Sequence, residues 1–440
     1  MTIKSISRAR FDALCFLRRP GTKFHGEERE WYADENENVL GVVILDRTDQ
    51  DWLYVVLGRD EVARFRAIDQ EINYRTDTEA RIAAHKKMEE YSLVGETIFP
   101  QGLERKNKKT FLIFKPMTSK EKLHQDFIVL LESKAFSPAR EIITEIAYTF
   151  EDPDGNYIQQ FQTEGFDARL WELYLYSVLH EMDFEMDRTC KAPDYVCSWF
   201  GKKVIVEATT VNPTQQNDVT KMTTLKDSEL EDYMATKFGS ALYSKLQKCY
   251  WKEDHVKSHP FVLAVADLRK PSGRIYSAPF LMQYLYGMRQ HEKPGGISYS
   301  PIKEHVWGGK RIPSGFFYLP DAENTSAVLF SDSGTISKFN RMGKIAGFGD
   351  LSVTMGREGE RYATALSEKP EPFRVLVEPG KYKETWAEGI WIFHNPMAKV
   401  PLDKELFPGV AHVYLENGGF TTYLSDAFPT WSTTLIFSTE

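Results

Sequence analysis

The order of secondary-structure patterns between residues 166 and 268 is the feature that most restricts how this chain can fold. Apolar residues at helical spacing across 166–182 are followed by a short strand pattern, "FEMDRT", and by two apolar runs joined at a glycine turn within 191–210. A polar loop then leads to a second helical pattern over 228–251. Residues 260–268, "PFVLAVADL", form the near-continuous apolar run typical of a buried strand. The sequence therefore predicts a helix, three strands, a helix and a strand, in that order.

The residues before this segment predict a small α/β unit. Two strand patterns, 39–46 and 51–58, are joined by a polar turn, and a helical pattern over 76–92 begins at a Thr-Asp pair. A basic, polar stretch at 103–109 is a plausible domain boundary. After it we expect one more strand and then two helices, at these positions: 110–116, 122–133 and 137–150.

The residues after about 298 predict a β-rich region, because short apolar and aromatic runs alternate there with Gly, Pro and Asn. This region either covers the middle domain or stands beside it. The predicted fold class is α/β in the mixed, α+β sense. The predicted domains are 1–118, 119–297 and 298–440.

Composition excludes several classes of protein. The formal net charge of −8 argues against a protein coated with basic surface, although local basic grooves stay open. The four cysteines form no C-x-x-C pair, which gives no sign of a zinc site or a disulfide framework. No apolar run approaches the roughly 18 residues that span a membrane, and the N-terminus lacks the apolar core of a secretory signal. We expect a cytoplasmic protein without a membrane partner.

Two carboxylates in the predicted hairpin need an explanation. In "KAPDYVCSWFGKKVIVEATT" (191–210), a type II′ turn at Gly201-Lys202 would place Asp194 and Glu207 on one face as diagonal neighbours. A slip of one residue would separate them onto opposite faces. Two buried carboxylates this close cannot both stay ionised without a cation. Mg²⁺, or Mn²⁺ in its place, would resolve the conflict, since Mg²⁺ typically takes one or two carboxylates with waters and phosphate oxygens.

These residues resemble the PD-(D/E)XK nuclease superfamily. The resemblance consists of a helix with an internal Glu (Glu172), then Pro-Asp ending at Asp194, twelve residues, Glu-Ala-Thr from Glu207, and then a helix and a buried strand. It covers roughly residues 165–270 and implies a restriction-endonuclease-like core. It also implies that Asp194, Glu207 and the backbone carbonyl of Ala208 bind the metal, with Glu172 matching the helix Glu of many members.

The chain departs from the family pattern where a lysine is expected, because that position holds Thr209. Some members supply the lysine from the following helix. If that helix is interrupted at Gly239 and restarts at Ser240, Lys245 would lie in its first turns and face Glu207; Lys237 is the alternative.

Simpler interpretations exist for most of these residues. Pro-Asp occurs three times in the chain, and only the pair ending at Asp194 precedes such a hairpin. Glu172 fits an exposed helix position equally well. Lys338 and Arg341, within "SKFNRMGK", suit contacts to nucleic-acid phosphates, but a charged surface turn explains them as well.

The predicted function is metal-dependent phosphodiester hydrolysis by an endonuclease acting on nucleic acid, more on DNA than on RNA. The alternative is a nuclease-like fold that has lost its chemistry and serves as a nucleic-acid-binding or assembly module. The missing motif lysine is the main support for this alternative. The sequence leaves open the oligomeric state and the target specificity.

Overall fold

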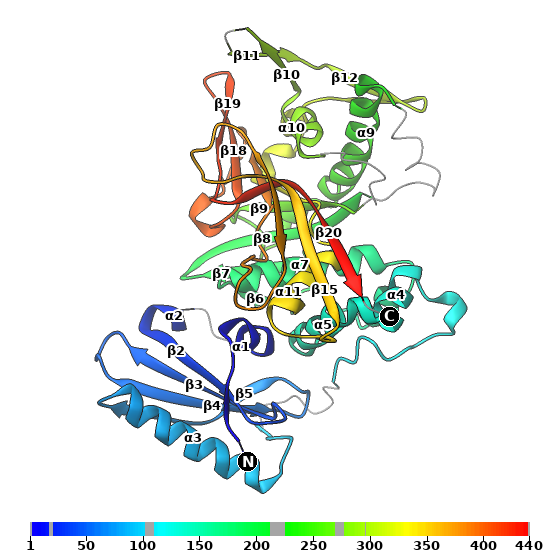
Figure 1. Cartoon of the computed structure of the whole chain (residues 1–440). Helices are drawn as coiled ribbons and strands as arrows, with labels where there is room; N and C mark the ends of the chain where they lie inside the picture. Colours follow the sequence, from blue (N-terminus) through cyan, green and yellow to red (C-terminus); the bar gives the residue numbers. More distant parts are fainter. Residues whose placement is uncertain are drawn as a thin grey trace.

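The computed structural model describes residues 2–16, 21–101, 110–211, 225–268, 277–294 and 296–438. Within them the fold is mixed α/β, as predicted, and it is built around two large sheets (Figure 1). The predicted boundary at 103–109 and most of the polar loop at 211–227 lie outside the described residues.

The N-terminal sheet is an antiparallel meander in the order β1-β2-β3-β4-β5. Helix α3 covers one face, where Met88 packs so closely on Gly41 that a Cβ there would lie 2.5 Å from the sulfur atom. The other face packs against α1 and α5, which contribute to the central core. The elements are β1 Lys4–Ser5, α1 Arg8–Leu14, α2 Thr22–His25, β2 Gly26–Ala33, β3 Val39–Asp46, β4 Trp52–Arg59, β5 Phe65–Tyr74 and α3 Asp77–Val94. The predicted strands and helix of this unit are confirmed to within a residue or two.

The segment 110–116 is not a strand, so that prediction is wrong. The buried side chain of Gln162 donates to the carbonyls of Ile113 and Lys115 over 2.9 and 2.8 Å and accepts from the amide of Met117 over 2.8 Å. These bonds satisfy the backbone without a strand partner. The helices that follow are α4 Gln125–Glu132, α5 Ser137–Thr149, α6 Tyr157–Gln162 and α7 Phe166–Glu181.

The central sheet has eight strands in the order β19-β18-β17-β14-β9-β8-β7-β6. It contains the predicted succession of elements, namely α7, β6, β7, β8, α9 and β9. The pairs β8–β9, β9–β14 and β17–β18 are parallel, and the remaining neighbours are antiparallel. Its strands are β6 Glu185–Asp187, β7 Tyr195–Trp199, β8 Lys202–Val211, β9 Phe261–Asp267, β14 Ala327–Ser331, β17 Trp391–His394, β18 Ala411–Glu416 and β19 Gly419–Tyr423.

Helices cover both faces of the central sheet. Helix α7 packs on one face in a core that includes Trp171 and Val206, while α9 and α10 pack on the other against Ile205 and Leu263. Alternation of side chains along β8 explains this division. Helix α9 spans Asp227–Leu246 and α10 spans Ala278–Tyr286.

The C-terminal residues extend the same sheet, because β14, β17, β18 and β19 all belong to it. A separate three-stranded sheet, β16-β15-β20, packs nearby, and two ribbons project from the body (Figure 1). These remaining elements are β10 Met288–Lys293, β11 Gly296–Pro301, β12 Glu304–Trp307, β13 Lys310–Pro313, α11 Ile336–Ile345, β15 Val353–Tyr362, β16 Glu371–Leu376 and β20 Phe428–Ser438. None of the described helices is long and apolar enough to cross a membrane.

Candidate active site

The turn of the β7–β8 hairpin differs from the predicted one. Trp199 pairs with Lys202, so the loop consists of Phe200 and Gly201, whose φ angles are 46° and 81°. Positive φ at both central residues is the mark of a type I′ turn. The predicted type II′ turn is wrong, and the register differs by two residues.

This difference leaves the faces of the hairpin unchanged, because side chains alternate with a period of two. Tyr195 pairs with Val206. Extending that register by one residue places Asp194 opposite Glu207 rather than opposite Thr209. The two carboxylates are therefore direct neighbours across the hairpin instead of diagonal ones.

Each carboxylate accepts one hydrogen bond from a backbone amide on the opposite side of the hairpin. The amide of Asp194 donates to Oε2 of Glu207 over 3.1 Å, and the amide of Ala208 donates to Oδ2 of Asp194 over 2.8 Å. Glu207 is 3% exposed and Asp194 is half-buried. The loop before Asp194 is held in turn by His255, whose Nε2 lies 3.1 Å from the carbonyl oxygen of Ala192. The carboxylate pair is thus fixed from both strands.

Helix α9 brings Lys245 to this pair. Its Nζ lies 2.5 Å from Oε1 of Glu207. The helix runs unbroken through Gly239, where a Cβ would come within 2.7 Å of the hydroxyl oxygen of Tyr284. The predicted interruption at Gly239 is therefore wrong, and Lys245 lies in the last turn of the helix rather than its first. Lys237, two turns earlier, lies 5.4 Å from the ring centroid of Tyr233.

Glu172 approaches the site from α7, on the other face of the sheet. Its carboxylate accepts two hydrogen bonds from Nη1 of Arg169, at 2.7 and 2.9 Å, and its carbonyl oxygen accepts one from the hydroxyl of Tyr195 at 2.6 Å. At 7% exposure it is buried, which excludes the alternative of an exposed helix position.

At two carboxylates of the site, burial and the charge of Asp194 outweigh the nearby cations. Burial first, and then the charge of Asp194, raise the pKa of Glu207 to about 7 against the opposing effect of Lys245. The same two causes raise the pKa of Glu172 to about 7 against the effect of Arg169. A cation near Asp194 would favour the ionised forms of both.

Three residues near the site were missed in the sequence. Arg169 pairs with Glu172 at a spacing of three, which helix geometry could have suggested. Tyr250 follows α9, and burial and then the charge of Glu207 raise the pKa of its hydroxyl group. Arg188 follows β6 and is 7% exposed, with its guanidinium 4.7 Å from the ring centroid of Tyr195. The last two contacts are long-range and leave no local pattern.

The oxygen donors of Asp194 and Glu207 are the kind that Mg²⁺ prefers, and Ala208 lies beside them through its bond to Asp194. Glu172 does not join them as a third close ligand. Among the described residues, the group of three whose ligand atoms all lie within 4.8 Å of one another is Glu231, Asp232 and His305.

That second cluster has a structural explanation. Arg289 binds both oxygens of Glu231, at 3.0 and 2.6 Å. His305 contacts Asp232 through Nδ1 and Ser314 through Nε2, both at 3.0 Å. The charged and polar groups of this cluster therefore pair with each other, and they connect the β12–β13 ribbon to α9.

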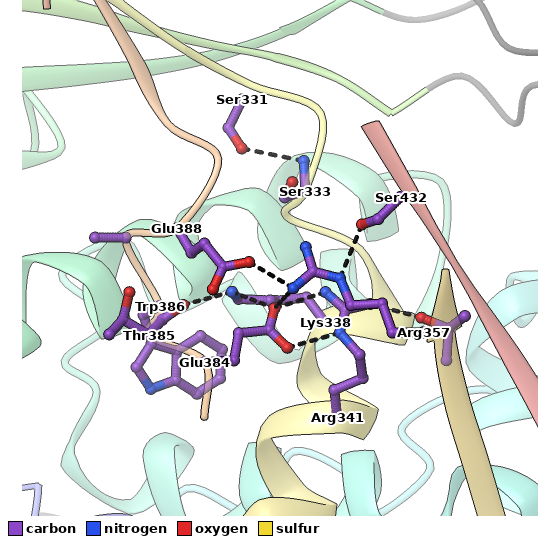
Figure 2. Close-up of polar contacts among 12 residues, drawn as sticks. Ser331, Ser333, Lys338, Arg341, Arg357, Glu384, Thr385, Trp386, Glu388 and Ser432 are labelled. Atoms are coloured by element: carbon purple, nitrogen blue, oxygen red, sulfur yellow. Dashed lines mark hydrogen bonds and ion pairs between the residues drawn. The ribbon is translucent and has the colours of Figure 1, made fainter. Parts of the chain in front are cut away.

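Lys338 and Arg341 are not part of an exposed basic turn, so that interpretation is wrong. Both lie in α11 and are buried, at 0% and 5% exposure. Nζ of Lys338 lies 2.6 Å from Oε1 of Glu384, and Arg341 binds both oxygens of the same carboxylate at 2.8 Å (Figure 2). Arg357, from β15, lies 3.5 Å from it. Their charges form ion pairs inside the protein and are not exposed to nucleic acid.

The chain matches no family model, no curated protein and no solved structure. Arguments about function therefore depend on the geometry of the site.

Proposed function

We propose that this protein is a Mg²⁺-dependent phosphodiesterase, a DNA endonuclease of the PD-(D/E)XK type. The observation that carries the proposal is the meeting of Asp194 and Glu207 across one hairpin, with Lys245 against Glu207. Two carboxylates and one lysine in such contact are the groups that this chemistry uses.

Asp194 and Glu207 would hold the ion, with the carbonyl of Ala208 as a further ligand. A divalent ion bound there supplies an activated water and stabilises charge that develops on the phosphate. Glu172, with Arg169 fixing its carboxylate, would orient water at the edge of the site.

Lys245 takes the role for which the family pattern expects a lysine in place of Thr209. Its ammonium group reaches the carboxylate of Glu207, and 27% of the side chain is exposed. From there it can stabilise the attacking water and the charge on the scissile phosphate. The partial exposure leaves room for it to contact a substrate as well as Glu207.

One observation favours the alternative, a nuclease-like module that binds nucleic acid without cutting it. Both oxygens of Glu207 already have partners, Oε1 in Lys245 and Oε2 in the amide of Asp194. If these contacts persist whenever a metal is offered, the site is a structural ion pair.

Cleavage assays separate the two functions. Supercoiled plasmid, linear duplex DNA and RNA are each incubated with the protein in Mg²⁺, in Mn²⁺ and in EDTA. We expect metal-dependent cutting of DNA that falls by a factor of about 10² or more in Asp194→Asn and in Glu207→Gln. Asp232→Asn, in the second acidic cluster, is the matched control and should cut normally. No cleavage of any substrate with either metal, or equal cleavage by all variants, would reject the proposal.

A further inference from the structure

The chain makes a strained turn just after α9. Cys249 has φ 54° and ψ 37°, in the left-handed region that glycine usually occupies after a helix. Its amide donates to the carbonyl oxygen of Leu246 over 3.1 Å, and its carbonyl oxygen accepts from the amide of Lys252 over 3.0 Å. The short 3-10 helix η3 (Tyr250–Lys252) follows. A residue with a Cβ is strained in this conformation, and the hydrogen bonds on both sides hold it there.

This turn decides where the side chain of Tyr250 lies. If α9 continued in regular form, Tyr250 would follow Lys245 by about 140° around the helix axis and about 7.5 Å along it. Instead the ring of Tyr250 packs beside that of Phe261, with the ring centroids 6.2 Å apart. Phe261 pairs with Ile205 of β8, and Ile205 faces the same side of the sheet as Glu207. The turn therefore brings Tyr250 back over the face that carries Glu207.

The hydroxyl group of Tyr250 is a hydrogen-bond donor beside the carboxylate pair. Burial first, then the charge of Glu207 and a hydrogen bond to that carboxylate, raise the pKa of this hydroxyl group, which therefore keeps its proton at neutral pH. Asp194 acts in the same direction, so the hydroxyl group lies near both carboxylates. Tyr250 is half-buried, so part of it faces solvent. Glu207 thus has a neutral donor in Tyr250 and a charged donor in Lys245.

We propose that Tyr250 is a further catalytic residue, whose hydroxyl group donates a hydrogen bond to the phosphate that is cleaved at Asp194 and Glu207. The inference rests on the proposed function for its substrate. A phosphate bound at this pair comes next to the donors that face Glu207.

The chemistry of phosphodiester hydrolysis gives such a donor its role. The oxygen of water bonds to phosphorus and releases a proton to solvent, while the leaving oxygen takes the electron pair of the broken bond and then a proton. Negative charge grows on the phosphate oxygens during this exchange. A donor that is already in place stabilises that charge. Tyr250 keeps its own proton throughout.

Tyr250→Phe removes the hydroxyl group and keeps the ring that packs beside Phe261. Three measurements on the full chain separate a contact with substrate from a contact with Glu207 alone. They are the single-turnover rate of plasmid cleavage in saturating Mg²⁺, the Kd for Mn²⁺ by calorimetry, and the Kd for a labelled duplex in EDTA. We expect the rate to fall roughly tenfold to a hundredfold, and both Kd values to change by less than about twofold.

Tyr243→Phe is the matched control, because Tyr243 belongs to the same helix and is 49% exposed. It should cleave as wild type does. A rate for Tyr250→Phe equal to that of wild type, or a fall in rate that weaker binding of Mn²⁺ or of the duplex explains, would overturn the inference and leave the proposed function in place. A wild-type protein that cuts no substrate would reject the proposed function, and the inference with it.

Discussion

Two buried glutamates, Glu207 and Glu384, are surrounded by opposite balances of charge. Glu384 has a fully buried side chain that contacts Lys338, Arg341 and Arg357 (Figure 2). Burial alone would raise its pKa, but these three cations outweigh burial and hold the pKa well below its ordinary value. Glu207 contacts one cation, Lys245, and neighbours a second carboxylate.

The difference distinguishes a structural carboxylate from a candidate catalytic one. The cations around Glu384 come from α11 and β15, so the carboxylate joins the helix to the three-stranded sheet. The pKa of Glu207 is instead raised to about 7 by burial and by Asp194, and Lys245 does not offset these two effects. Perturbed carboxylates of this kind are more common at functional sites.

The largest effect should follow from removing the structural carboxylate. Glu384→Gln leaves buried Lys338 and Arg341 without their carboxylate partner, whereas Arg357 keeps Glu388, and we expect the free energy of unfolding to fall by about 3–5 kcal/mol. Glu207→Gln, in EDTA and at about pH 6, should change it by less than about 1 kcal/mol, because it removes one of two repelling carboxylates. Urea denaturation of both variants measures this contrast. Equal losses of stability in the two variants would contradict the difference proposed between Glu384 and Glu207.

The single cation at Glu207 should matter for rate more than for stability. Lys245→Ala should lower the rate of metal-dependent cleavage by a factor of about 10² to 10³, since a preorganised charge near the scissile phosphate is lost. The apparent affinity for Mg²⁺ should change far less. Single-turnover cleavage across a Mg²⁺ titration gives both values.

Lys237→Ala is the control for this prediction, because Lys237 lies over Tyr233 in the same helix. It should cleave at a rate close to that of wild type. A strong effect at Lys237 with none at Lys245 would contradict the assignment of the lysine.

The pH dependence of stability should differ in sign between the two glutamates. The folded pKa of Glu207, about 7, lies above its ordinary value of 4.5, so the folded state holds more protons between these values. Its contribution to stability therefore falls as pH rises from 5 to 7, by about 2 kcal/mol. The folded pKa of Glu384 is depressed, so its contribution is present above about pH 4.5 and is lost as pH falls below that.

Urea denaturation in EDTA at several pH values between 5 and 8 tests these signs. Glu207→Gln should gain stability relative to wild type as pH rises through this range. Glu384→Gln should stay destabilised throughout it and recover relative to wild type only in more acidic solution. Parallel curves for the two variants would mean that the charge balances do not differ.

The sequence predicted the central elements and the approach of Asp194 to Glu207, and the reasons are physical. Side chains along a strand alternate with a period of two, so a register error of two residues leaves Asp194 and Glu207 on the same face. The wrong turn type therefore did not change this prediction. The contact of Lys245 with Glu207 was predicted for a helix interrupted at Gly239. The contact forms in the unbroken helix as well, because Lys245 faces the sheet there too.

Other features could not be read from local patterns. Glu384 lies in an irregular segment, and its partners Lys338 and Arg357 are 46 and 27 residues earlier, in a helix and a strand. Nothing in "SKFNRMGK" indicates that its cations are buried. Likewise, the apolar run at 110–116 looked like a strand because the bonds that Gln162 makes to it depend on the tertiary fold.

Direct measurement of metal binding tests the central claim, that Asp194 and Glu207 form a divalent cation site. Calorimetric titration of Mn²⁺ into the wild-type protein above pH 7, with Asp194→Asn, Glu207→Gln and the control Asp232→Asn beside it, reports the number of ions bound and their affinity. We expect binding at this site in wild type and in the control, and its loss in both site variants. Mn²⁺ binding that is the same in all four proteins, or absent from wild type, would contradict the claim.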